Sequence, residues 1–309
     1  MKRELRKVVR PLIAVVIGIG VLLQVVFAFT YVSAAETNYA PWVGDVSRLD
    51  DECDRSENAC LAELASAREQ AAYVAEDFRL ASVMQTPLGM VGVAAGNFAS
   101  FIGALIVAAI ASTYVGGEWS GRTISSVLVR DPDRRRLAMR QFSIVLIVAL
   151  AALLVSILVL ALVSLLLDVA FDVTPPVGDL DVSAWAVDRL STGFLVVVAF
   201  AAVGVLFGHV ARRPFGAFLL FIGAVVGFHA AALVDGLYIA TPVYWIASWM
   251  ELVPGDALAD HAWLDRFPLL AESAVPAAPA VWTGVALALL AVGALGASIR
   301  RLVSRDIAQ

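Results

Sequence analysis

The residues whose types and spacing suit chemistry are concentrated in residues 116–140, GGEWSGRTISSVLVRDPDRRRLAMR, which we call the basic segment. It places a carboxylate beside an indole, at Glu118 and Trp119, and contains six arginines. Guanidinium groups bind carboxylates and phosphates through paired hydrogen bonds, and indoles favour the boundary between lipid and water. The basic segment therefore suits docking, either to lipid headgroups or to acidic groups of another protein, and charge alone leaves both alternatives open.

Groups that common enzyme mechanisms need are missing from the sequence. Lys2 and Lys7 are the only lysines, and neither follows the glycine pattern of a phosphate-binding loop. His209, His229 and His261 have no Cys or carboxylate at the spacing of metal ligands. The HExxH and GxSxG motifs, and a membrane Asp pair, are also absent. We therefore expect no enzymatic activity, no metal site and no cofactor bound by this chain.

Uncharged segments flank the basic segment and recur along the chain. With 61% hydrophobic residues, 16% charged residues and a mean hydropathy of +0.85, the chain is more apolar than a soluble domain, in which about 25% of residues are charged. A run of about 20 apolar residues crosses a bilayer as a helix. The pattern predicts an all-α, polytopic membrane protein with one transmembrane domain of six helices. The expected spans are residues 11–35, 87–115, 141–167, 190–211, 214–234 and 276–299.

A secretory signal peptide is the alternative interpretation of the first span. Basic residues precede it, and Ser33, Ala34 and Ala35 resemble a cleavage site. Its apolar stretch is longer than the roughly 7 to 15 residues of a signal-peptide core. We therefore expect this segment to remain as a span.

The charges between the spans predict the orientation. If both termini are cytoplasmic, sixteen of the 22 Lys and Arg residues lie on the inner side, with only five of the 27 acidic residues. Cytoplasmic loops of membrane proteins carry such an excess of Lys and Arg. We expect a multi-pass protein of the cytoplasmic (plasma) membrane, with the N and C termini inside and the basic segment at the inner surface. The basic residues report this topology and do not predict nucleic-acid binding.

The outer side is expected to carry two structured regions. Residues 36–86 are acidic and have a helical pattern, so we expect an outer helical loop, interpreted as a solvated helix rather than a substrate contact. Cys53 and Cys60 fall in this loop, where an oxidising compartment permits a disulfide; two unpaired thiols are the alternative. Residues 241–255, TPVYWIASWMELVPG, are too few to span and predict re-entrant or interfacial helices between spans five and six.

Polar residues inside the expected spans are few. For His229 we expect a helix-packing or carbonyl-bonded imidazole first, and a substrate contact second. For Gln24 and Asn97 we expect hydrogen bonds between packed helices first, and the lining of a pathway second. The spans contain no Asp or Glu, which argues against proton coupling through buried carboxylates. A channel or facilitator is disfavoured as well, because no polar stripe runs through the spans.

Within the basic segment, Ile124, Val127 and Leu128 recur at helical spacing, whereas Arg122 faces elsewhere. This pattern predicts a short amphipathic helix at the inner surface. The run EWSGRTI from Glu118, followed by Pro132 and two arginines, resembles a segment of type 2 ABC exporter permeases. In that family a Glu lies four residues before Gly-Thr-aliphatic, and Pro-x-Arg follows. Arg122 departs from the pattern, since the family usually has Gly before the Thr.

The resemblance implies that the basic segment contains a coupling helix, which touches a separate ATPase subunit. The chain would then be the permease subunit of an ABC transporter, exporting a substrate with ATP and Mg bound at the partner ATPase. Implied partners are ABC ATPase subunits, a second permease copy or homologue, and membrane lipids. The residues implied in ATPase coupling are Glu118, Trp119, Gly121, Arg122, Thr123, Arg134 and Arg135, with Arg136 as a further lipid or acidic-groove contact.

A function from another class remains open. The acidic outer loop would suit a membrane sensor or assembly scaffold that transports nothing and binds an extracellular partner. Copurification separates the two hypotheses, because only the transporter requires an ATPase with a phosphate-binding loop.

Overall fold

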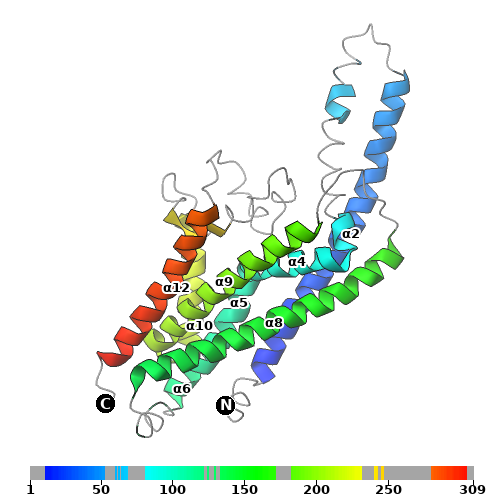
Figure 1. Cartoon of the computed structure of the whole chain (residues 1–309). Helices are drawn as coiled ribbons and strands as arrows, with labels where there is room; N and C mark the ends of the chain where they lie inside the picture. Colours follow the sequence, from blue (N-terminus) through cyan, green and yellow to red (C-terminus); the bar gives the residue numbers. More distant parts are fainter. Residues whose placement is uncertain are drawn as a thin grey trace.

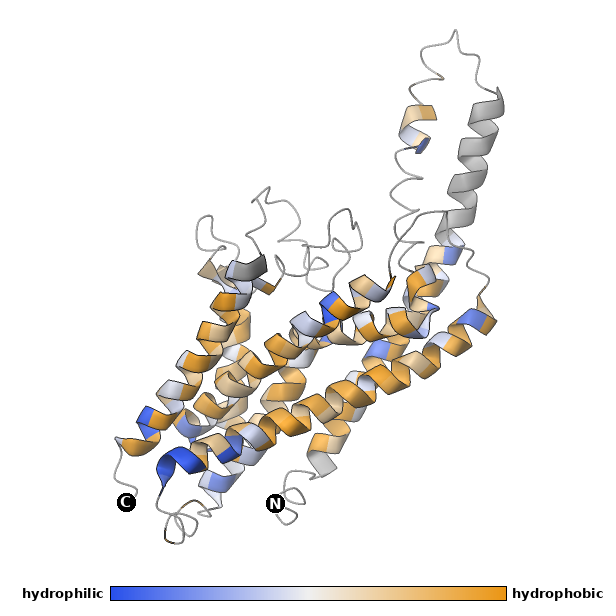
Figure 2. Cartoon of the chain, viewed as in Figure 1, coloured by the Kyte–Doolittle hydropathy of each residue, from blue (hydrophilic) through white to orange (hydrophobic). Residues whose placement is uncertain are grey.

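The fold comes from a computed structural model of the chain. It describes residues 11–52, 60, 62, 64–68, 81–121, 124, 129, 133–171, 182–231, 240–242, 245–246 and 280–304. Every regular element within these ranges is helical, and six helices are long and apolar enough to cross a membrane. The prediction of an all-α protein with six membrane helices is confirmed. The helices of the bundle consist mostly of hydrophobic residues (Figure 2). Many of their large apolar side chains are exposed, as expected for contact with lipid.

The membrane helices form one slanted bundle (Figure 1). Helix α2 begins and α12 ends at the end of the bundle that carries α6, which we call the α6 end. The long helices are α2 (Pro11–Glu52), α8 (Arg134–Ala170), α9 (Val182–Ala211), α10 (Pro214–Ala231) and α12 (Ala280–Val303).

The expected span 87–115 is not one helix. It consists of α4 (Pro87–Ala99), α5 (Phe101–Ala111) and a π-helical turn η1 (Ser112–Gly116), which continues into α6 (Gly117–Ser120). Only the part from Phe101 to Ser120 is long enough to cross a membrane, and α4 is a separate short apolar helix. The second crossing therefore starts later than its uncharged run suggests.

Ser100 makes the break between α4 and α5. Its backbone is extended, its hydroxyl donates to the carbonyl of Asn97 at 2.6 Å, and the same hydroxyl accepts from the amide of Ile102 at 3.2 Å. One serine thus caps both helices. A Cβ at Gly103 would lie 2.0 Å from the carbonyl oxygen of Phe98, so only glycine fits this turn.

Two membrane helices begin earlier than expected. Helix α8 starts at Arg134, because the Asp133 carboxylate accepts hydrogen bonds from the amides of Arg135 and Arg136, at 3.0 and 3.2 Å. Helix α9 starts at Val182 rather than near residue 190. Charged residues at the edge of an uncharged run therefore do not end the helix here.

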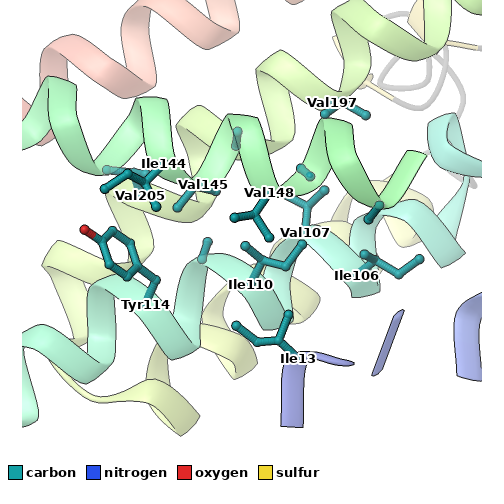
Figure 3. Packing of buried hydrophobic residues seen from close by; sticks show 14 of the residues in the cluster. Ile13, Ile106, Val107, Ile110, Tyr114, Ile144, Val145, Val148, Val197 and Val205 are labelled. Carbon is teal, nitrogen blue, oxygen red and sulfur yellow. The ribbon is translucent and has the colours of Figure 1, made fainter. Parts of the chain in front are cut away.

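Helix α9 lies at the centre of the bundle and packs against α4, α5, α8, α10 and α12. Figure 3 shows a large apolar cluster, whose members include Ile106 and Ile110 of α5, Val145 and Val148 of α8, and Val205 of α9. Small residues let the backbones approach closely, as is usual where helices pack inside a membrane.

The region predicted as the outer loop is mostly helical where it is described. Helix α2 continues past the expected span as far as Glu52, and residues 64–68 are helical (Figure 1). Of residues 241–255, the expected re-entrant stretch, only 241, 242, 245 and 246 are among the described residues. Only Arg212 and Arg213 separate α9 from α10, as the expected spans 190–211 and 214–234 imply.

Candidate functional site

At the α6 end, α6 lies beside the start of α8 and the last turns of α9 and α12 (Figure 1). Hydrophilic residues are concentrated in the helices there, whereas the middle of the bundle is mostly hydrophobic (Figure 2). Three cross-helix contacts join these ends, and each involves a residue of the basic segment. The candidate site is this set of contacts.

The first contact joins α6 to α8. The side-chain amide of Gln141 donates to a carboxylate oxygen of Glu118 at 2.6 Å. Glu118 is only 8% exposed, and Gln141 is fully buried. A charge-assisted hydrogen bond between buried groups is stronger than one in water. Glu118 therefore holds α6 against α8 and does not present its carboxylate on the surface.

The π-helical turn η1 orients α6 for this contact. A π-helical turn bonds each residue to the fifth one along, so it rotates the following residues around the helix axis. Gly116 ends the turn, and a Cβ there would lie 2.9 Å from the backbone of Arg213 and Pro214. The end of η1, just before α6, is thus packed closely against the turn between α9 and α10.

The second contact joins α6 to α9. The indole of Trp119 donates to Nδ1 of His209 at 3.0 Å, with the two rings edge to face and their centroids 6.0 Å apart. The Arg212 guanidinium lies over the Trp119 ring, 4.6 Å from its centroid, at a distance typical of a cation–π interaction. Arg212 has a φ of 55°, which a non-glycine residue adopts only when its surroundings hold it there.

The third contact joins the start of α8 to the end of α12. The Arg134 guanidinium donates to the carbonyl oxygens of Leu302 and Val303, both at 3.0 Å. The last carbonyls of a helix have no partner within the helix, and they attract positive charge. Arg134 therefore caps α12, a role that its sequence context did not indicate.

The remaining predicted site residues are divided between surface positions and undescribed ones. Gly121 and Arg135 are exposed at the α6 end, and Ile124 is buried, as expected for the apolar side of an amphipathic helix. Arg122 and Thr123 lie outside the described residues. The partners of Trp119 and Arg134 were missed because His209 and Leu302 are far along the chain, and no local pattern marks them.

The polar residues of the spans behave differently from one another. His229 Nδ1 lies 2.8 Å from the carbonyl oxygen of Val225, and its ring meets Phe101 edge to face, which agrees with a packing role. Gln24 and Asn97 are fully buried, and neither side-chain amide has a hydrogen-bond partner among the described residues. The expected bonds between helices are therefore not formed by these two amides.

Elsewhere in the described residues, Cys60 is disulfide-bonded. Cys53, the other cysteine of the sequence, lies outside them. No group of three or more His, Cys, Asp or Glu side chains in the described ranges is placed to hold a metal ion.

Comparison with known proteins gives no relative. No family model, no curated protein and no solved structure matches the chain.

Proposed function

We propose that this chain is the permease subunit of an ABC transporter of the type 2 exporter kind. The observation that carries the proposal is the junction at the α6 end, where residues of one basic segment bind three different membrane helices. A segment that receives force from a partner must be joined firmly to the helices that it moves. The resemblance of the same segment to the coupling region of these permeases points to that partner.

In this proposal the ATPase subunit docks on the cytoplasmic side, at the α6 end, and binds ATP and Mg itself. The exposed groups of the basic segment, Gly121 and Arg135, form the docking surface together with Arg122, Thr123 and Arg136. Glu118, Trp119 and Arg134 do not contact the ATPase themselves but connect the docking surface to the membrane helices. They position α6 and pass its displacement to α8, α9 and α12.

The direction of transport and the pairing of two permeases also belong to the proposal. A second copy of this chain, or a homologue, would complete the pathway, and the substrate would leave the cell. Membrane lipids surround the apolar outer faces of the helices. The chain itself contributes no catalytic group.

Copurification tests the proposal most simply. The tagged full-length chain, extracted in mild detergent from the cells that encode it, should carry a stoichiometric ATPase with a phosphate-binding loop. Arg135→Glu should weaken that association, because it reverses a charge on the exposed face of the basic segment. Arg48→Glu, in the expected outer loop, is the matched control.

The alternative function predicts the opposite result. A sensor or scaffold would copurify with a partner of its outer loop and with no ATPase, and Arg135→Glu would leave that partner in place. This outcome would overturn the assignment as a permease.

A further inference from the structure

A cavity of about 420 Å³ lies in the wall of the bundle between α9, α10 and α12. We call it the side-wall cavity. All of its lining residues are apolar. Its size falls within the roughly 300 to 1,000 Å³ of typical small-molecule sites, but the few polar groups that usually orient such a ligand are missing from the lining.

The cavity has an aromatic floor. Phe221 is 1% exposed and meets Phe200 and Phe207 edge to face, with centroid distances of 5.9 and 6.2 Å. The mouth is formed by more exposed residues, Phe228 at 39% and Leu289 at 64%. The side-wall cavity is therefore closed toward α5 and open toward the surrounding membrane.

The lining and the size restrict the occupant. Water needs two to four polar partners, which this lining does not offer. A single hydrocarbon chain is thin and flexible enough to enter, and its environment outside the cavity is equally apolar.

We propose that the side-wall cavity binds one hydrocarbon chain of an amphiphile. The chain comes either from a resident membrane lipid or from a molecule that the protein moves. Both sources share the same chemistry at this site, and the experiment below separates them.

The contacts at the α6 end link the cavity to the basic segment. Trp119 binds His209, which lies two residues beyond the lining residue Phe207 on α9. Arg134 binds the carbonyls at the end of α12, the helix that supplies Gly293 and Ala297 to the lining. A displacement of the basic segment would therefore move α9 and α12, two walls of the cavity. This coupling rests on the proposed function, whereas the binding of a hydrocarbon chain does not.

Two glycines of α12 provide a matched pair of variants. A Cβ at Gly293 or at Gly296 meets no atom within 4 Å, so both positions accept a larger side chain. Gly293 lines the cavity and Gly296 does not. Gly293→Leu should narrow the cavity, and Gly296→Leu adds the same group to the same helix outside it. Ala297→Leu, one turn after Gly293, is a second narrowing variant should the first fail to fold.

The experiment uses the full-length chain in vesicles of phosphatidylethanolamine and phosphatidylglycerol, part of the latter carrying a diazirine on one acyl chain. After illumination, adducts are mapped by mass spectrometry. We expect adducts on Phe207 and Phe221, the second of which is closed to the lipids around the protein. Labelling at these positions should fall several-fold in Gly293→Leu and remain in Gly296→Leu. The absence of adducts in the wild-type cavity would overturn the proposal, and a second copy covering the mouth would give this result. Labelling in Gly293→Leu as strong as in the wild type would overturn it as well.

A second arm repeats the labelling with the ATPase partner and ATP. Constant labelling of Phe221 during turnover supports a resident lipid. A several-fold fall during turnover supports a chain that belongs to the transported molecule. If the cavity residues are labelled but no ATPase copurifies, the cavity still binds a lipid chain and the transporter function is wrong. Failure of the cavity proposal and failure of the proposed function are therefore distinguishable.

Discussion

Helix α9 packs tightly on one side and loosely on the other. Toward α4 and η1, a Cβ at Gly193 would lie 2.8 Å from the carbonyl oxygen of Ala95, and one at Gly208 would lie 2.6 Å from Cβ of Val115. Toward α10 and α12 the packing leaves a cavity of about 420 Å³. Backbones in direct contact move together, whereas the walls of a cavity can shift separately. We therefore expect the side of α9 that packs on α4 and η1 to be a rigid half of the bundle, and the side that packs on α10 and α12 around the cavity to be an adaptable half.

The largest expected effect breaks the rigid half. Gly193→Leu places a side chain against the backbone of Ala95, which cannot move aside, and should lower the free energy of unfolding by about 3 kcal/mol. Gly293→Leu, in the adaptable half, should leave stability unchanged or slightly raised, since its Cβ meets nothing. Thermal unfolding of both variants in detergent measures the difference. Equal losses would remove the distinction between the two halves.

The second effect concerns the contact between α6 and α8. Gln141→Leu keeps the size of the side chain but leaves the buried Glu118 carboxylate without this donor, and should cost about 2 kcal/mol. The same unfolding assay measures the loss. Met139→Leu, an exposed position on the same helix, is the control and should unfold as the wild type does. A neutral Gln141→Leu would show that this hydrogen bond does not hold α6.

A smaller effect is expected at the link between α6 and α9. Trp119→Phe keeps an aromatic ring under Arg212 but removes the hydrogen bond to His209, at a cost of about 1 kcal/mol. Nitrogen-15 NMR of the labelled His209 ring reads out the contact directly, because Nδ1 loses its donor. An unchanged His209 signal in Trp119→Phe would contradict the contact. Trp282→Phe, on the exposed face of α12, should leave that signal alone.

The smallest expected effect concerns the contact between Arg134 and the end of α12, which joins the basic segment to the adaptable half. Arg134→Leu removes both hydrogen bonds to the end of α12 and should cost about 0.5 to 1 kcal/mol, since the site is partly exposed. In Arg134→Leu, the hydrogen-exchange rate of the backbone amides near Leu302 should therefore rise. Arg134→Lys keeps the positive charge and should recover part of the protection. If Arg134→Leu leaves the exchange rate near Leu302 unchanged, Arg134 does not connect the basic segment to α12.

The six membrane helices follow from the distribution of charge. Long uncharged runs separated by basic or acidic clusters predict helices with little ambiguity, and the structure confirms their number. The break at Ser100 was not predictable in the same way. Its surroundings carry no charge and no proline, and the turn depends on the fit of Gly103 against Phe98.

The residues of the candidate site were only partly predictable. The basic segment itself was marked by charge and by its resemblance to a family. The burial of Glu118, however, depends on the π-helical turn before it and on Gln141, 23 residues further along the chain. The pairing of Trp119 with His209 joins residues 90 positions apart. A single sequence contains no signal for contacts of this kind, because they depend on how the helices are packed.

The most direct test of the proposed function is the rate of ATP hydrolysis by the ATPase subunit that the proposal requires, measured in complex with this chain and relative to that of the isolated ATPase. We predict that Trp119→Phe and Gln141→Leu assemble normally and lower this ratio several-fold, while Met139→Leu retains it. An unchanged ratio in complexes of normal composition would contradict the claim that the α6 end transmits motion between the ATPase and the membrane helices.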